Sequence, residues 1–173
     1  IHAMGNGPGD AEDYQEIIEK YDTFCGGFVW EWCDHAVNMG KTNEGKTKYY
    51  YGGDFGEFPH DGNFCMDGLV YPDRTPSPGL KEFKNVIRPL RITAGDLSKG
   101  EFVFRNILDF TNIADLLTVK YAVVRNGTAL FEGEISDPAV LDLAPHASKT
   151  IALGCELPTD GIVTVDFTLI QKK

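Results

Sequence analysis

The sequence predicts an α/β unit followed by an antiparallel β-sandwich, because the pattern of residues changes at Pro89. Before this proline, helical periodicity flanks a short aromatic stretch and a long polar connection. After it, short β-branched and aromatic runs alternate with turn signals such as Asn126-Gly127. Such spacing is typical of an immunoglobulin-like sandwich. We therefore place two domains, at residues 1–89 and 90–173.

Composition narrows the class of protein. The chain has 173 residues and 42% hydrophobic content, enough to bury a core, and no apolar run near the roughly 20 residues that a membrane helix needs. A formal net charge of −10, spread along the chain, argues against nucleic acid or a membrane surface as partner. The four cysteines lack C-x-x-C spacing, so we expect no zinc site, no disulfide framework and a cytoplasmic location. The start at Ile1, without an initiator Met, suggests a piece of a longer protein.

The first helix is predicted from Asp10 to about Tyr21, with Asp10 able to cap it. Residues 4–10 before it form a turn-rich loop, whose glycines fit a phosphate-binding loop only weakly because no Lys-Ser/Thr follows. Four apolar residues recur at i, i+3, i+4 and i+7, the stripe of an amphipathic helix: Tyr14, Ile17, Ile18 and Tyr21.

The aromatic stretch at residues 26–34 holds both tryptophans and predicts a β-strand. Alternation places Phe28, Trp30 and Trp32 on one face of this strand. That face fits either core packing or a platform for a planar or ring-shaped ligand. Glu31 has the opposite parity, so we expect it to point away from such a pocket.

The connection at residues 34–76 is long, and loops of this length inside compact domains are usually functional. Within it, residues 43–46 predict the turn of a small hairpin. Ser77 and Pro78 are typical of an N-cap and a first helical residue, and the helix they begin is expected to run to about Arg88.

The second half of the chain predicts strands at regular intervals. Its clearest hairpin turn is Asn126-Gly127. His146 lies beside Pro145 and is interpreted as a solvated loop residue. The expected strands are Leu90–Thr93, Glu101–Asn106, Leu116–Arg125, Thr128–Ile135, Lys149–Leu153 and Ile162–Ile170.

Three motifs occur in a fixed order in the first half. They are His-Ala-Met-Gly-Asn from His2, Gly-Gly-Phe-Val-Trp-Glu-Trp-Cys-Asp from Gly26, and Tyr-Gly-Gly-Asp-Phe-Gly from Tyr51 with Asn-Phe-Cys-Met-Asp-Gly-Leu-Val from Asn63. In this order and spacing they resemble the end of the catalytic (β/α)8 TIM barrel of the large bacterial β-galactosidases, glycoside hydrolase family 2. The likeness covers roughly residues 1 to 90, and the remainder fits the β-sandwich domain that follows the barrel there.

The resemblance implies roles for particular residues. His2 is similar to the family's galactose hydroxyl-binding histidine, and Trp30 to the tryptophan that walls the galactose pocket. Phe64, through its carbonyl, and Asp67, through its side chain, occupy the positions of sodium ligands. The best-known relative has Asn at the position of Asp67, so the carboxylate here favours a different ion or none. The catalytic nucleophile is expected just before Ile1 and the acid/base glutamate and magnesium ligands further upstream, so this chain holds no catalytic residue.

The resemblance also implies an activity. The longer protein is expected to be a retaining β-galactosidase that uses Mg and Na and hydrolyses terminal β-D-galactosyl residues, for example of lactose, through a covalent galactosyl-enzyme. Retention needs two carboxyl groups about 5 Å apart, and without them we expect the isolated chain to be inactive. The alternative is a non-catalytic carbohydrate-binding or assembly module, which would bind galactose without hydrolysis.

Other carboxylates near the motifs are Glu31, Asp34, Asp54, Glu57 and Asp61. We expect the three aspartates among them to cap loops, to accept hydrogen bonds or to support the residues that contact a ligand. We also expect the longer protein to be a homo-oligomer. The isolated chain is expected to associate with itself, since a barrel strand without neighbours on both edges exposes apolar surface.

Overall fold

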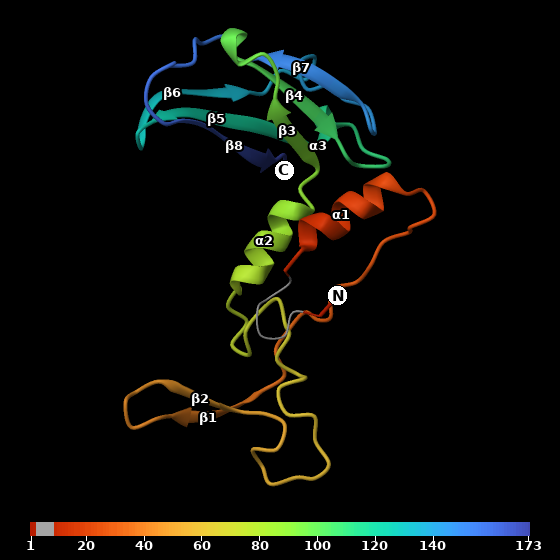
Figure 1. Cartoon of the computed structure of the whole chain (residues 1–173), viewed down its shortest axis with the longest axis vertical. Helices are drawn as coiled ribbons and strands as arrows, with labels where there is room; N and C mark the ends of the chain where they lie inside the picture. Colours follow the sequence, from red (N-terminus) through yellow and green to blue (C-terminus); the bar gives the residue numbers. More distant parts are fainter. Residues whose placement is uncertain (3–8) are drawn as a thin grey trace. The chain divides into compact units, whose positions relative to one another are not determined.

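The computed structural model describes residues 1–2 and 9–173 (Figure 1). They form two compact units, Ile1–Ile87 and Arg88–Lys173. The rest of the His-Ala-Met-Gly-Asn motif and the predicted turn-rich loop up to residue 8 lie outside the described residues. Among the helices of the described part, none is both long and apolar enough to cross a membrane.

The described residues of the first unit form two helices, which contact each other. The predicted amphipathic helix is confirmed as α1 (Ala11–Lys20). Asp10 occupies its N-cap position in a left-handed conformation, but its side chain makes no cap hydrogen bond, so the predicted cap is wrong. The second helix is confirmed as α2 (Pro78–Val86), where the Oγ of Ser77 accepts a hydrogen bond from the Leu80 N–H at 3.3 Å.

The predicted hairpin in the long connection is confirmed. Strands β1 (Val37–Lys41) and β2 (Thr47–Tyr50) pair antiparallel, and Figure 1 shows them in orange. The Thr42 N–H donates to the carbonyl of Lys46 at 2.8 Å, which closes the turn.

The aromatic segment is not the continuous strand that alternation predicts. Trp30 forms an isolated parallel bridge with His2, and Cys33 forms another with Val70. The Val70 N–H also donates to the carbonyl of Trp32 at 2.9 Å. The segment therefore has bonded neighbours on both edges, and the expectation that it would lack them is wrong.

The second unit consists, within the described residues, of two three-stranded antiparallel sheets, with strand orders β3-β4-β7 and β6-β5-β8. Each predicted strand is matched by an observed one. The elements are β3 (Leu90–Ala94), the 3-10 turn η1 (Leu97–Lys99), β4 (Glu101–Asn106), α3 (Ile113–Leu116), β5 (Leu117–Arg125), β6 (Thr128–Ile135), β7 (Ser148–Ala152) and β8 (Val163–Gln171).

The two sheets pack on a shared hydrophobic core. Phe102 and Phe104 of β4 meet Phe167 of β8 edge to face, with ring centroids 5.1 and 5.8 Å apart. Phe104 and Val119, on opposite sheets, are fully buried. The second unit is therefore an antiparallel β-sandwich.

Local signals in this unit act as expected. Asn126 and Gly127 have φ of 49° and 81°, the left-handed pair that a tight β5–β6 hairpin turn needs. His146 is a largely exposed loop residue, as predicted, and its Nε2 lies 3.0 Å from Oδ1 of Asp109.

Candidate functional site

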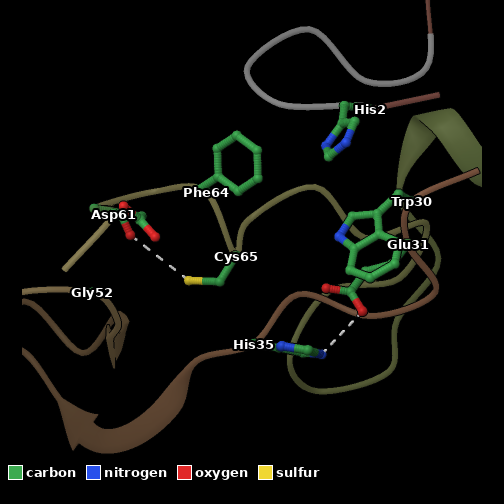
Figure 2. A pocket seen from close by; sticks show the side chains of 9 residues that line it. His2, Trp30, Glu31, His35, Gly52, Asp61, Phe64 and Cys65 are labelled. Atoms are coloured by element: carbon green, nitrogen blue, oxygen red, sulfur yellow. Dashed lines mark hydrogen bonds and ion pairs between the residues drawn. The ribbon is translucent and has the colours of Figure 1, made fainter.

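The first unit contains a pocket of about 560 Å³, shown in Figure 2. Its walls come from the N-terminal residues, the aromatic segment, His35 just after that segment and the loop that follows β2. All of these except His35 belong to regions that carry the sequence motifs. Three of the four predicted site residues, His2, Trp30 and Phe64, line it together. The described residues that line it are His2, Trp30, Glu31, His35, Gly52, Asp61, Gly62, Phe64 and Cys65.

Asp67, the fourth predicted residue, holds His2. Its side chain is fully buried, and its Oδ2 lies 3.1 Å from Nδ1 of the imidazole, whose side chain is 44% exposed. A carboxylate on one ring nitrogen fixes the orientation of the ring and leaves Nε2 as its second polar atom. The other carboxylate oxygen, Oδ1, is buried and has no hydrogen-bond partner among the residues that the structure describes.

Aromatic rings surround the imidazole. The ring centroid of His2 lies 5.3 Å from that of Phe64 and 6.3 Å from that of Trp30. Trp30 is 56% exposed, Phe28 is 92% exposed and Trp32 is 62% exposed. Among the described residues, Trp30 lines the pocket, whereas Phe28 and Trp32 do not. The interpretation of these three rings as core residues is therefore wrong for this chain. Of the three, Trp30 is the one that lines the pocket. Because the segment makes isolated bridges instead of a ladder, alternation does not bring the rings to one wall.

Glu31 corrects a second expectation. It lines the same pocket as Trp30 instead of pointing away from it, for the same reason that the segment is not a regular strand. Its Oε2 lies 3.3 Å from Nε2 of His35, another pocket residue that the motifs did not single out. The i, i+4 spacing of Glu31 and His35 is the one sequence pattern that could have predicted their contact. This spacing indicates contact on a helix, however, and not on an irregular segment.

The carboxylates of the loops mostly act as hydrogen-bond acceptors, as predicted. Asp34 accepts from the Gly68 N–H at 2.8 Å, and Asp54 accepts from the Tyr51 N–H at 2.9 Å. Asp61 instead lies on the pocket wall.

Glu57 organises the loop that includes the pocket residue Gly52. Its carboxylate accepts from the N–H groups of Gly53 at 2.6 Å and Phe55 at 3.0 Å. The Gly53 hydrogen bond is the largest cause that lowers the pKa of Glu57 below its ordinary value of 4.5.

A pH titration of this loop follows from the lowered pKa. The contribution of Glu57 to loop order is complete above pH 4.5 and is lost as the pH falls through the lower pKa of the folded chain. The amide NMR signals of Gly53 and Phe55 are expected to titrate with a midpoint below 4.5, and Glu57→Gln is expected to abolish the titration. A midpoint at or above 4.5 would contradict these hydrogen bonds.

Comparisons with known proteins agree with this arrangement. The family described as "Glycosyl hydrolases family 2, TIM barrel domain" matches residues 1–92. The chain is similar to a beta-galactosidase of Actinobacillus pleuropneumoniae, with 47% identity over 172 residues, which are 97% of this chain and 16% of the relative. A beta-galactosidase of Staphylococcus xylosus is 47% identical over 88% of this chain and 15% of its own length, and one of Kluyveromyces lactis is 43% identical over 68% and 12%.

The chain thus spans at most 16% of the length of these three relatives. The similarity to the first relative runs through both units, and the family match ends just inside the second. The motif residues His2, Trp30, Phe64 and Asp67 all fall within the matched range. The chain belongs to glycosyl hydrolase family 2, and residues 1–92 belong to the TIM barrel domain of that family.

Proposed function

We propose that this chain is part of a longer retaining β-galactosidase and supplies the galactose-binding side of its active site. The observation that supports this most is the convergence of His2, Trp30 and Phe64 on one pocket, with His2 held by the buried Asp67. The relatives named above are beta-galactosidases. A pocket of about 560 Å³ lies within the range of about 300–1,000 Å³ that is usual for small-molecule sites.

The residues of this chain bind and orient the sugar. The indole of Trp30 offers a flat apolar face to the patch of C–H bonds on galactose and keeps water from that side of the ring. His2, fixed through Nδ1, offers its other ring nitrogen to a sugar hydroxyl. A retaining reaction then needs a nucleophile and an acid/base carboxyl about 5 Å apart. In this proposal both glutamates and the magnesium ligands lie upstream of Ile1.

Asp67 and Phe64 fit a site for a sodium-type cation. Such a cation prefers hard oxygen ligands, and Oδ1 of Asp67 is a buried oxygen without a partner among the described residues. The Phe64 carbonyl would supply a second oxygen. When bound, the cation would balance the buried carboxylate and attract a sugar hydroxyl.

Substitution of Asp67 tests the cation site in the longer protein. Asp67→Ala is expected to remove the dependence of KM on sodium, measured in sodium chloride against choline chloride, whereas Asp67→Asn keeps an oxygen ligand and is expected to retain part of it. Asp109→Ala, at an exposed carboxylate of the second unit, is the control. Unchanged sodium dependence in Asp67→Ala would exclude Asp67 as a ligand.

Hydrolysis of a chromogenic β-galactoside tests the proposed function. The longer protein is expected to turn it over, and the purified 173-residue chain is expected to release product at the rate of buffer alone. Turnover by the chain alone would show that the catalytic carboxylates do not lie upstream. Binding of galactose by the longer protein without any hydrolysis would favour the carbohydrate-binding module instead.

The proposal also covers the fold type of the second unit, the cellular location of the protein and the self-association of the isolated chain. The two face-packed antiparallel sheets support an immunoglobulin-like sandwich. The cysteines are free thiols, which supports a cytoplasmic location: Cys25, Cys33, Cys65 and Cys155. The exposed Phe28 and Trp32 support self-association of the isolated chain, and analytical ultracentrifugation would measure it.

A further inference from the structure

A second imidazole–carboxylate pair lines the pocket, and the proposed galactose contacts do not use it. Glu31 and His35 lie 3.3 Å apart through Oε2 and Nε2. Figure 2 shows both side chains beside Trp30, with a dashed line joining them. The side chain of Glu31 is 24% exposed and that of His35 is 64% exposed, so the pair reaches from the pocket wall toward solvent.

The backbone holds this pair in place. The Glu31 N–H donates to the carbonyl of Asp67 at 3.0 Å, and the carbonyl of Glu31 accepts from the Leu69 N–H at 2.9 Å. The His35 N–H donates to the carbonyl of Cys65 at 2.8 Å. The segment from Cys65 to Leu69, which carries Asp67, therefore also fixes the second pair, whereas an ordinary surface ion pair has no such support and contributes little.

The chemistry of the pair suits hydroxyl groups. A carboxylate can accept about four hydrogen bonds, so the contact with His35 leaves Glu31 able to accept from ligand hydroxyls as well. An imidazole can donate or accept at each nitrogen, depending on its tautomer. Together with the rings of Trp30 and Phe64, which line the same pocket, these groups match a polyhydroxylated ring.

We propose that Glu31 and His35 bind the hydroxyl groups of the second sugar of a disaccharide substrate, the one that leaves when the galactosidic bond breaks. The identification of the second sugar as the leaving group rests on the proposed function, whereas the binding of a second sugar ring does not depend on hydrolysis. The pocket volume of about 560 Å³ supports this, because pockets of about 300–1,000 Å³ bury ligands of drug size, which are larger than one hexose. The pair thus determines preference for the aglycone and takes no part in the chemical step.

Kinetics of the longer protein test the proposal. Glu31→Gln and His35→Gln are each expected to lower the ratio of kcat/KM for lactose to kcat/KM for nitrophenyl β-galactoside about tenfold, since each substitution removes one hydrogen bond to a sugar hydroxyl. Glu44→Gln is the matched control, because Glu44 lies 76% exposed in the β1–β2 turn, and its ratio is expected to stay at the wild-type value. A ratio that is unchanged in both pocket variants would overturn the proposal.

Calorimetric binding separates this proposal from the proposed function. Glu31→Gln and His35→Gln are expected to weaken lactose about tenfold relative to galactose, whether or not the longer protein hydrolyses either ligand. Failure of the wild-type protein to hydrolyse any β-galactoside would overturn the proposed function alone. Equal weakening of lactose and galactose in both variants would overturn the second-sugar site alone. His35→Gln guards against a folding defect, because its side chain is mostly exposed.

Discussion

Gly68→Ala is expected to destabilise the first unit by about 3–5 kcal/mol, the range of severe single substitutions. A Cβ at Gly68 would lie 2.2 Å from the backbone nitrogen of Asp34 and 2.4 Å from the carbonyl carbon of Cys33. These are backbone atoms, and the Asp34 N–H is itself bonded to the carbonyl of Val70 at 3.0 Å. Relief of the clash therefore separates the segment that carries Trp30 from the segment that carries Asp67.

Gly27→Ala is the matched control for this substitution. A Cβ at Gly27 would meet the side chain of Ile1 at 3.6 Å, which is ordinary contact, and Gly27 has no positive φ. Urea unfolding followed by tryptophan fluorescence measures both variants, because both tryptophans lie in the first unit. Equal stability of the two variants would show that the close approach at Gly68 is not required.

Trp30→Ala is expected to lower kcat/KM of the longer protein for a β-galactoside about 100-fold, which corresponds to about 2.7 kcal/mol. The loss combines the apolar contact area of the indole with the packing of an aromatic face on the sugar. It is expected to appear mainly in KM, because this contact is made to the ground state as well as to the transition state.

The neighbouring tryptophan provides the control. Trp32 is 62% exposed and lies outside the pocket lining formed by the described residues, so Trp32→Ala is expected to change kcat/KM less than about threefold. Similar losses in the two variants would mean that both rings contact the sugar or that neither does so directly.

The second unit was predictable because its signals are local. Strand β4 has the predicted bounds Glu101–Asn106, and β5 begins one residue after the predicted Leu116. Short β-branched runs and the Asn126-Gly127 turn specify strands through their own conformational preferences. The pairing of these strands into two sheets then follows from the need to bury one face of each.

The pocket was less predictable, because it is built from contacts between distant parts of the chain. The resemblance in motifs identified His2, Trp30, Phe64 and Asp67, and three of these four line the pocket. The bond between His2 and Asp67 joins residues 65 positions apart and leaves no periodic pattern in the sequence.

Alternation failed in the aromatic segment for a related reason. Isolated bridges from Trp30 to His2 and from Cys33 to Val70 replace a continuous ladder there. Side-chain parity holds only along a regular strand, and so the position of Glu31 on the pocket wall could not be read from it.

The most direct measurement is a crystal structure of the longer protein with galactose bound. The sugar ring is expected to pack its C–H face on the indole of Trp30, with a hydroxyl within hydrogen-bond distance of His2. A galactose bound elsewhere, with neither Trp30 nor His2 in contact, would contradict the role proposed for this pocket.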